Sequence, residues 1–355
     1  WILISIFDES NQNMKLLIDV THPAHVHFFK WATHIWQEHG HEVKYVARDK
    51  EMTTQLLDAY KIPYKTLSKI RNGLFGLSVE LIEHQARLFK IIQEYHPDMI
   101  LNIGGTFIVH VGKLLGVKTC VFTDTEHAKL SNGITFPFAS FICTPESYTE
   151  DLGDKHHRYK GYQELAYLHP NQFSPNSKVL SDLGLQEGER FFLLRFVSWG
   201  ASHDVGKKGM SLDGKIKLVE SLNKQGRVLI TSELPLSGGL EQFSIQVSPT
   251  HIHDLLYYAS MYIGEGATMA SEAAILGTPS VYVNPLGSGN LNEITNKYCL
   301  CSTYAPNNND LEKILILATD KGLKQKHQSR REKMLEEKID VTAWMVNYIE
   351  SFGRN

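Results

Sequence analysis

Residues 15–46 decide the fold, and they read KLLIDVTHPAHVHFFKWATHIWQEHGHEVKYV. The first six form a short aliphatic run, which is typical of a buried parallel strand. A polar loop is expected over 21–27, followed by a helix over 28–39 that ends at a glycine. A second strand is expected over 41–46, so the stretch predicts one βαβ unit.

Strands alternate with helices through the rest of the chain as well. Further strands are expected over 97–103, 117–122, 190–196, 227–231, 261–263 and 280–283, and helices over 52–60, 77–95, 215–225, 253–259, 267–276 and 341–352. This alternation predicts an α/β fold of doubly wound domains, in which ligands bind beyond the carboxyl ends of the strands.

The chain has 355 residues, which is enough for two domains. The segment 168–177 is rich in Pro, Asn and Ser, as linkers are. We expect an N-terminal domain over 14–165, a linker over 166–178 and a C-terminal domain over 179–340. Residues 1–13 are too short to span a bilayer, and we expect them to be a non-native or disordered extension that precedes the natural start.

The composition excludes several classes of protein. Hydrophobic residues make up 42% and charged residues 21% of the chain, which rules out a disordered or fibrous protein. The 36 basic and 39 acidic residues give a formal net charge of −3, so no basic surplus favours nucleic acid as a partner. Four scattered cysteines are too few for a disulfide framework, and we expect buried thiols in a reducing cytoplasm.

The segment 262–281, YIGEGATMASEAAILGTPSV, is the most informative for function. A strand ends, Gly264 and Gly266 let the backbone approach a ligand, and a helix begins whose first N–H groups attract an anion. Thr268 adds a hydroxyl, and Glu272 lies where it can reach a ribose. The alternative is a tight turn followed by a solvated acid. The segment lacks the Walker lysine and the full dinucleotide fingerprint, which disfavours nucleotide hydrolysis and hydride transfer.

Three histidines, His22, His25 and His27, follow the first strand, so fold geometry places them at the edge of the sheet where ligands bind. Histidine is the side chain best matched to proton transfer near neutral pH. Two alternatives stay open. The histidines could ligate zinc, although no further ligands are evident, or they could cap the helix and pack under it.

Acidic side chains follow another expected strand, in the segment 122–128, FTDTEHA. Asp124, Glu126 and His127 can supply a base and an orienting carboxylate. After the histidine loop and this segment, a third loop, 195–204, follows the first expected strand of the second half.

This third loop resembles the one that closes on the donor phosphates in GT-B enzymes. The resemblance implies that Arg195 neutralises a leaving diphosphate and that Ser198 donates a hydrogen bond to it, while His203 can pair with Asp204. Arg195 can equally belong to a structural ion pair.

The segment 262–281 resembles the donor site of GT-B glycosyltransferases, especially the N-acetylglucosaminyl transferase of peptidoglycan synthesis, and that of UDP-N-acetylglucosamine 2-epimerases. The resemblance implies that Gly266, Ala267 and Thr268 hold the pyrophosphate of a UDP-sugar and that Glu272 holds the ribose. The segment 250–256, THIHDLL, is similar to the one whose backbone binds uracil in these enzymes, and this similarity makes Ile252 the candidate uracil contact. Asn290 and Asn292 stand where these enzymes place polar sugar contacts, although a Gln is usual there.

Nearly the whole chain from Met14 is similar to a GT-B-like family known as domain of unknown function 354. The segments 19–29, 124–128 and 264–269 carry this resemblance. It implies a GT-B-like fold, with two doubly wound Rossmann-like domains facing across a cleft and a final helix, 341–355, that crosses back to the first domain.

The first domain of such enzymes binds the acceptor. There His25 is the nearest match to a histidine of the acceptor-domain loop of the peptidoglycan enzyme, and His27 belongs to the same side. Gly104, Gly105 and Thr106 resemble a neighbouring helix start in the 2-epimerases, with a plain strand–helix turn as the alternative.

Together these features predict a metal-independent glycosyltransferase without a cofactor. It would use a nucleotide sugar, most simply a UDP-sugar, and transfer the sugar to a hydroxyl of a cell-surface or lipid-linked glycan precursor. The resemblance implies a cytoplasmic enzyme that contacts the inner face of the membrane peripherally. The alternatives are a UDP-N-acetylglucosamine 2-epimerase-like enzyme and a non-catalytic nucleotide-sugar-binding protein.

Overall fold

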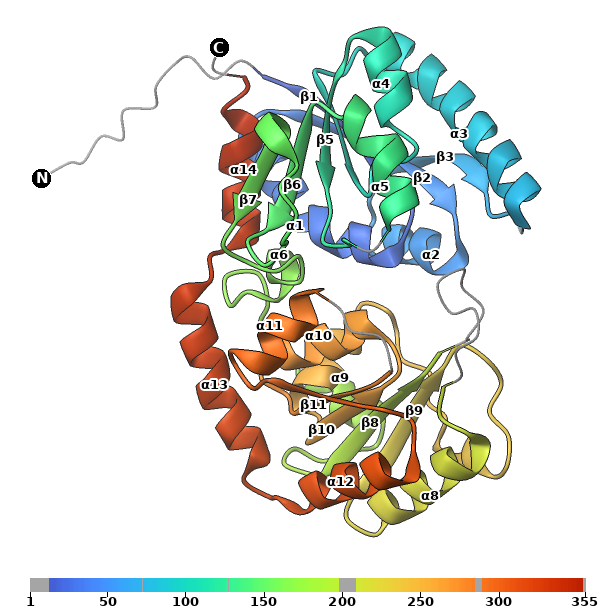
Figure 1. Cartoon of the computed structure of the whole chain (residues 1–355), viewed down its shortest axis with the longest axis vertical. Helices are drawn as coiled ribbons and strands as arrows, with labels where there is room; N and C mark the ends of the chain where they lie inside the picture. Colours follow the sequence, from blue (N-terminus) through green and yellow to red (C-terminus); the bar gives the residue numbers. More distant parts are fainter. Residues whose placement is uncertain (1–12, 72, 127, 198–208, 285–288, 354–355) are drawn as a thin grey trace, which may run out of the picture. The chain divides into compact units, whose positions relative to one another are not determined.

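The computed structural model describes residues 13–71, 73–126, 128–197, 209–284 and 289–353. The chain divides into two compact units (Figure 1). Unit 1 comprises the chain up to Gln172 together with the segment from Ile339 onward, and unit 2 comprises Phe173–Lys338. Each unit is a parallel-sheet α/β domain of the Rossmann-like kind, so the predicted fold class is confirmed for both.

Unit 1 is built on a seven-stranded parallel sheet in the order β3-β2-β1-β4-β5-β6-β7. Its strands are β1 (Lys15–Val20), β2 (Glu42–Asp49), β3 (Tyr64–Lys69), β4 (Met99–Ile103), β5 (Lys118–Phe122), β6 (Phe141–Pro145) and β7 (His156–Tyr159). Its helices are α1 (Pro23–Glu38), α2 (Glu51–Ala59), α3 (Gly73–Tyr95), α4 (Val109–Leu115), α5 (Lys129–Thr135), α6 (Leu165–Leu168) and α14 (Val341–Glu350). Two short 3₁₀ helices, η1 (Phe136–Phe138) and η2 (Gly153–Lys155), complete the unit.

Unit 2 is built on a five-stranded parallel sheet in the order β12-β11-β10-β8-β9. Its strands are β8 (Phe191–Phe196), β9 (Arg227–Ser232), β10 (Met261–Gly264), β11 (Ser280–Val283) and β12 (Cys301–Tyr304). Its helices are α7 (Lys178–Asp182), α8 (Leu212–Asn223), α9 (Ile252–Tyr258), α10 (Ala267–Ile275), α11 (Gly289–Asn296), α12 (Asn308–Thr319) and α13 (Leu323–Glu337), with the 3₁₀ helix η3 (Leu240–Phe243).

Aliphatic strand residues form the core of each unit. In unit 1, Leu17 and Ile100 pack with the buried face of α3, and in unit 2, Leu194 and Ile263 pack with apolar residues of α8 and α12. Strands buried on both faces read as continuous apolar runs, which explains why the sequence predicted the central strands well.

Each sheet has a point where the strand order reverses, between β1 and β4 in unit 1 and between β8 and β10 in unit 2. The loops that leave the carboxyl ends of these neighbouring strands diverge, which opens a crevice for ligands. The histidine-containing segment follows β1, and the glycine-rich turn follows β10. Two of the predicted motifs therefore lie at the switch points of their own sheets.

The prediction for the first helix was wrong in one respect that concerns function. Helix α1 begins at Pro23, five residues before the expected start, so His25 and His27 belong to its first turns and not to a loop. Proline suits this position because its fixed φ angle is helical and its missing N–H would have no partner. The side chain of His22 caps the helix by accepting the Ala24 N–H, with 3.2 Å between Nδ1 and N.

Other boundaries also differ. Part of the expected linker forms α6, whose four residues are buried in unit 1, and the units divide after Gln172. Helix α14 belongs to unit 1, where it packs on α1. Among the cysteines, Cys299 is exposed and not buried as expected.

Candidate functional site

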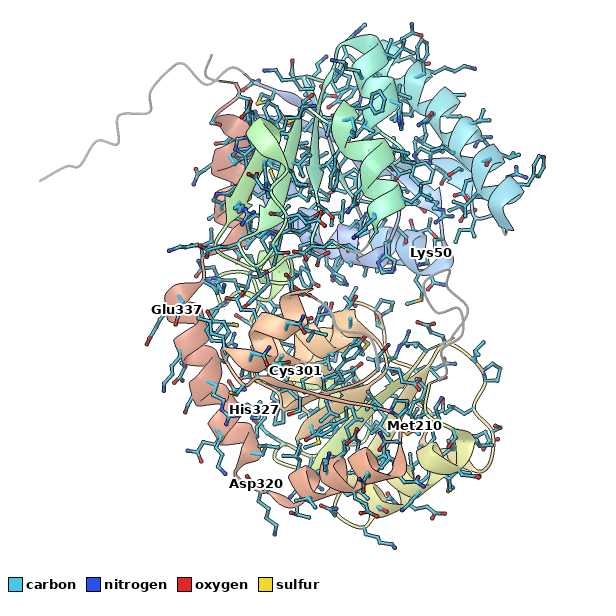
Figure 2. The ribbon with its side chains drawn as sticks, viewed as in Figure 1. Lys50, Met210, Cys301, Asp320, His327 and Glu337 are labelled. Carbon is cyan, nitrogen blue, oxygen red and sulfur yellow. The ribbon has the colours of Figure 1, made fainter. Side chains whose placement is uncertain are left out.

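The end of β1 positions His25 at the switch point of unit 1. The side chain is 8% exposed, and its Nδ1 accepts the Thr21 N–H at 3.4 Å. Burial lowers the pKa of His25 well below its usual value, and the neighbouring His22 and Lys50 (Figure 2) lower it further. His25 is therefore neutral at pH 7. Because Nδ1 accepts a hydrogen bond, the ring proton lies on Nε2, which makes His25 a hydrogen-bond donor in this state.

His27, predicted to lie on the acceptor side, faces a different direction from His25. Its ring stacks on Tyr167, with centroids 5.3 Å apart, and its Nδ1 lies 3.3 Å from the Tyr60 hydroxyl. Residues two apart on a helix do not face each other, so His27 and His25 lie on different sides of α1. His27 is a packing residue.

Asn102, at the end of β4, links strand β1 to the turn that follows β4. Its Nδ2 donates to the carbonyl oxygen of Asp19 (2.6 Å), and its Oδ1 accepts the Gly105 N–H (2.7 Å). Gly105 has a φ of 74°, and a Cβ there would lie 2.6 Å from a methyl group of Val121, so glycine is required for packing. The predicted Gly104–Thr106 helix start is instead a turn, and α4 begins three residues later, at Val109.

Thr106 takes part in holding this turn, because its hydroxyl oxygen lies 3.0 Å from that of Ser131. The turn resembles the plain strand–helix connection that the sequence left open. It contributes backbone to the edge of the sheet beside the end of β1.

The loop after β5 carries Asp124 and Glu126. Glu126 accepts hydrogen bonds from the N–H and the hydroxyl of Thr149, with 3.0 Å to the hydroxyl oxygen, so it ties this loop to the one after β6. Asp124 accepts a hydrogen bond from the Thr125 hydroxyl at 3.0 Å and is partly exposed. Glu126 is thus a tether between the loops after β5 and β6, while His127 lies outside the described residues.

A buried polar chain on the α3 side of the sheet was not predicted. His84 Nε2 lies 3.2 Å from Asp19 Oδ2, and His84 Nδ1 lies 2.8 Å from Ser68 Oγ. Glu80 continues the chain to Arg48, which binds it with two nitrogens. Asp19, His84 and Ser68 have the order of a hydrolytic triad, but all three are 0% exposed, so no substrate can reach the serine. The residues lie on separate elements, so sequence spacing gives no sign of the chain.

In unit 2, Arg195 and the glycine-rich turn lie side by side. The Cα of Arg195 at the end of β8 is in register with that of Gly264 at the end of β10, and Arg195 O accepts the Glu265 N–H at 3.2 Å. The guanidinium of Arg195 donates to Glu233 Oε1 at 3.1 Å, with 26% of the Arg195 side chain exposed. Arg195 is therefore an ion-pair member that still faces solvent beside the turn. Ser198 and His203 lie outside the described residues.

The reason for glycine differs between the two glycine positions of the turn. A Cβ at Gly264 would lie 2.0 Å from the Tyr262 hydroxyl oxygen, so packing alone requires glycine there. Gly266 has a φ of −100°, which any residue adopts, and a Cβ there would lie 3.4 Å from Val197, an ordinary contact. Neither backbone geometry nor packing requires Gly266, which leaves close approach by a ligand as a reason for it.

Glu265, between these glycines, was missed by the sequence analysis. Its buried carboxylate accepts the Val197 N–H (3.2 Å) and the N–H of Met210 (2.8 Å; Figure 2), and Lys215 Nζ lies 3.6 Å away. Its carbonyl oxygen accepts a hydrogen bond from Asn284 (3.1 Å). The residue holds the turn against β8, α8 and β11.

Glu272, the predicted ribose ligand, lies on α10 one turn beyond the helix start. Its Oε1 is 3.1 Å from Nε2 of His253, and the two residues are 4% and 5% exposed. His253 follows Ile252, the first residue of α9. The structure therefore brings the predicted uracil segment and the predicted ribose carboxylate together, with Ala267 and Thr268 in the first turn of the same helix.

Asn290 and Asn292 both lie on α11, but they do not share a side of it. Asn290 is buried and Asn292 is exposed. Residues two apart on a helix point in different directions, so the two amides predicted to contact the sugar lie on different sides of α11. Only Asn290 faces the interior of unit 2.

No described helix is long and apolar enough to cross a membrane. In the part of the chain that the structure describes, no three His, Cys, Asp or Glu side chains gather where they could hold a metal ion.

Curated relatives are distant. An uncharacterized protein of Methanocaldococcus jannaschii is 25% identical over 325 residues, covering 87% of this chain and 92% of that protein. The UDP-N-acetylglucosamine–N-acetylmuramyl-(pentapeptide) pyrophosphoryl-undecaprenol N-acetylglucosamine transferase of Flavobacterium psychrophilum is 22% identical over 242 residues, covering 60% of this chain and 59% of the transferase.

Solved structures share the fold over almost the whole chain. The UDP-GlcNAc 2-epimerase of Neisseria meningitidis, bound to UDP-GlcNAc, has a TM-score of 0.67 at 11% identity and covers 96% of this chain and 100% of its own. The glycosyltransferase SsfS6 of Streptomyces sp. SF2575, complexed with thymidine diphosphate, has a TM-score of 0.63 at 13% identity, with coverage of 96% and 100%. The GT-B-like fold expected from the sequence is thereby confirmed.

The family model described as protein of unknown function DUF354 matches residues 14–351. This match spans both sheets and every candidate residue discussed above. The chain belongs to the DUF354 family.

Proposed function

We propose that the protein binds a UDP-sugar on unit 2 and transfers the sugar to a hydroxyl of a glycan acceptor. The observation that carries the proposal is the glycine-rich turn at the β8/β10 switch point, with Arg195 in register beside Gly264. A helix N-terminus, a glycine that neither packing nor φ requires, and a solvent-facing guanidinium together form a site for a diphosphate. Proteins that share the fold act on or bind nucleotide sugars and nucleotides, which supports this ligand class.

In this proposal each donor residue has one task. The first N–H groups of α10, from Ala267 and Thr268, hold the phosphates, and Gly266 lets them approach the backbone. Glu272 accepts hydrogen bonds from the ribose hydroxyls, with its carboxylate oriented by His253. The backbone of Ile252 reads the base, and Asn290 contacts the sugar.

The transfer itself is a displacement at the anomeric carbon. The acceptor oxygen forms a bond to this carbon as the bond to the UDP oxygen breaks, and the bonding electrons leave with UDP. Arg195 stabilises the charge that develops on the diphosphate. We assign the acceptor proton to Asp124, a partly exposed carboxylate in the loop after β5, and give Glu126, which accepts two hydrogen bonds from Thr149, a supporting role.

A metal-independent reaction fits this arrangement, because Arg195 and the helix N-terminus supply the positive charge that a divalent ion would provide. The acceptor is proposed to be a cell-surface or lipid-linked glycan precursor. Peripheral contact with the inner face of a membrane would then use exposed apolar side chains of unit 1, such as Phe75 and Leu130, which are 85% and 83% exposed. We propose that the protein acts in the cytoplasm.

An epimerase on the same scaffold is the second candidate, because the structural similarity to the Neisseria 2-epimerase is as extensive as that to the glycosyltransferases. The two activities differ in their need for an acceptor. Incubation with UDP-N-acetylglucosamine alone, followed by NMR, separates them. Formation of the 2-epimer without a second substrate would replace the transferase proposal by the epimerase.

A thermal-shift screen of UDP-, GDP-, CMP- and dTDP-sugars tests the donor assignment. A ligand at 100 times its Kd stabilises the native state by about 2.7 kcal/mol, enough for a clear rise in Tm. We expect UDP-sugars to give this rise and Glu272→Gln, which keeps the shape of the side chain, to abolish it. A shift with GDP- or CMP-sugars alone would overturn the UDP assignment, and no shift with any of them would overturn the function.

A further inference from the structure

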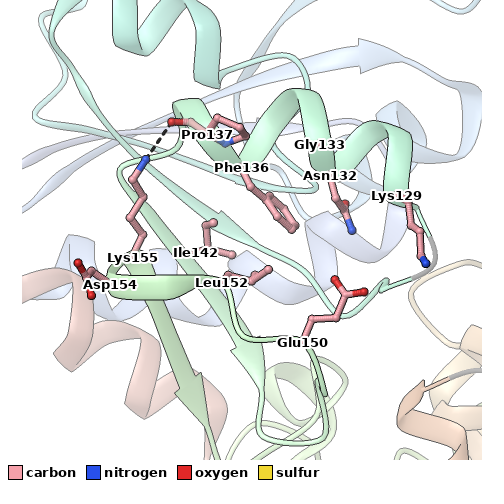
Figure 3. Close-up of a pocket in the computed structure, with 10 residues that line it drawn as sticks. All are labelled: Lys129, Asn132, Gly133, Phe136, Pro137, Ile142, Glu150, Leu152, Asp154 and Lys155. Atoms are coloured by element: carbon pink, nitrogen blue, oxygen red, sulfur yellow. Dashed lines mark hydrogen bonds between the residues drawn. The ribbon is translucent and has the colours of Figure 1, made fainter.

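A cavity of about 630 Å³ opens on unit 1 between α5, η1 and the connection from β6 to β7 (Figure 3). Phe136, Ile142 and Leu152 give it an apolar floor, and the side chains of Lys129, Asn132 and Glu150 stand around its opening. An apolar wall with a few polar groups is the usual make-up of a small-molecule site. The volume lies in the range of such sites as well.

The charges around the cavity cancel. Its lining includes two cations, Lys129 and Lys155, and two anions, Glu150 and Asp154. The ammonium of Lys155 is also bound to the carbonyl oxygen of Pro137, at 2.9 Å (Figure 3). A site without a net charge does not select a phosphate or a polyanion. An amide, a carboxylate and an ammonium beside an aromatic ring instead suit a neutral ligand with many hydroxyl groups and an apolar face.

Gly133 supports a ligand in this cavity. The residue lies inside α5, where glycine is less favourable than alanine. Its φ is not in the left-handed region, and a Cβ there would have nothing within 4 Å. Neither the backbone nor packing within the described chain therefore accounts for glycine. Any larger side chain would occupy space at the cavity, which gives a functional reason for the residue.

The cavity adjoins the loop that carries the proposed base. Asn132 Nδ2 donates to the carbonyl oxygen of Thr125 at 3.0 Å, directly after Asp124. On the other side, Glu150 follows Thr149, whose hydroxyl donates to Glu126 at 3.0 Å. A ligand in the cavity would thus contact both supports of the loop after β5.

We propose that this cavity binds an uncharged saccharide unit of the acceptor, with its apolar face on Phe136 and its hydroxyls on Asn132 and Glu150. The identification of this saccharide as the acceptor rests on the proposed function. The presence of a saccharide site rests only on the cavity, its charge balance and Gly133.

Saturation-transfer NMR on the full chain tests the site, with methyl glycosides of glucose, galactose and N-acetylglucosamine as probes and glucose 6-phosphate as the charged comparison. We expect at least one neutral glycoside to bind and the phosphorylated sugar to bind no better. Gly133→Leu should weaken that binding by about tenfold because it fills the cavity, and Gly133→Ala should weaken it less. Glu150→Gln should weaken it as well.

Lys217→Leu serves as the control, because it adds the same side chain at an exposed position of a helix in unit 2. Its glycoside binding should equal that of the wild type. If UDP-sugars stabilise the protein but no glycoside binds, or if Gly133→Leu binds like the wild type, the saccharide site is wrong and the proposed function stands. If glycosides bind in a Gly133-sensitive manner but no nucleotide sugar does, the site stands and the proposed function is wrong.

Discussion

Nε2 of His253 lies 3.1 Å from Oε1 of Glu272, and this contact joins the first turn of α9 to α10 inside unit 2. The carboxylate that we place on the ribose is therefore held in position before a ligand arrives. Such preorganisation reduces the entropy lost on binding. It also means that the two residues contribute to stability together.

Replacing either residue should show this coupling. We expect Glu272→Ala and His253→Ala each to lower the free energy of unfolding by about 1–3 kcal/mol, because each removes a buried polar contact. The double variant should lose less than the sum, with a coupling energy of about 0.5–3 kcal/mol. Urea unfolding of the four proteins measures it. Additive losses would show that the contact does not contribute to stability.

The glycine-rich turn yields a contrast between two alanine substitutions. Gly264→Ala places a Cβ 2.0 Å from the Tyr262 hydroxyl oxygen. We expect this substitution to lower the free energy of unfolding by at least about 3 kcal/mol or to prevent folding. Gly266→Ala makes only a 3.4 Å contact with Val197 and should leave the free energy of unfolding within about 0.5 kcal/mol of the wild type.

Gly266→Ala should instead affect the binding of UDP. The new methyl group of Gly266→Ala lies where the phosphates approach, so its affinity for UDP, measured by calorimetry, should fall by about tenfold or more. If Gly266→Ala binds UDP as tightly as the wild type, this turn is not part of the UDP site. A fully stable Gly264→Ala would contradict the packing explanation.

The lowered pKa of His25 should appear as a pH dependence of stability. Since burial keeps the folded-state pKa below the unfolded value of about 6.5, the unfolded chain binds a proton first as the pH falls. The free energy of unfolding therefore decreases below pH 6.5, by at most about 1.4 kcal/mol per pH unit from this residue.

His25→Gln removes the titrating group, while the other histidines remain in both proteins. The wild type should lose stability more steeply than the variant between pH 6.5 and 5, as measured by denaturant unfolding at each pH. Equal slopes would mean that His25 titrates in the folded protein as it does in the unfolded chain. Asp124→Asn should leave this slope unchanged and instead abolish transfer.

The sequence predicted the central strands because buried parallel strands are continuous apolar runs, as in β1 and β4. It missed the edge strands β3, β7 and β12, because edge strands are short or partly exposed and carry no such run. It also missed β6, with the sequence FICTP, a buried interior strand whose short apolar run ends at Thr144. The predicted and observed boundaries of β1 agree, whereas the start of α1 was predicted five residues late because its histidines look like loop residues.

For the candidate site, spacing along the chain identified loops but not partners. The glycine-rich turn and Arg195 were found because each directly follows an apolar strand. The contact of Glu272 with His253 and the chain from Asp19 through His84 to Ser68 join residues far apart in sequence, and only the folded arrangement reveals them. His25 and His27 were predicted together because a loop has no fixed face, whereas helix α1 turns their side chains in different directions.

Glu265 supplies the last prediction, because it is an acid at the centre of a proposed anion site. Its carboxylate is occupied by two N–H groups, from Val197 and Met210, and Lys215 Nζ lies 3.6 Å away, so its charge is largely compensated. Glu265→Ala leaves both N–H groups without this acceptor, and we expect a loss of about 2–5 kcal/mol in the free energy of unfolding.

Glu265→Gln separates this structural role from the charge. The amide keeps one acceptor oxygen but points its NH₂ at the second N–H, so stability should fall less than in Glu265→Ala, by about 1–3 kcal/mol. Removing the negative charge beside a diphosphate favours binding, while the displaced turn opposes it. Because the contacts position Gly266, we expect the displacement to dominate and UDP affinity to fall. Tighter UDP binding by a folded Glu265→Gln protein would show that the carboxylate acts on the ligand mainly through its charge and not through the geometry of the turn.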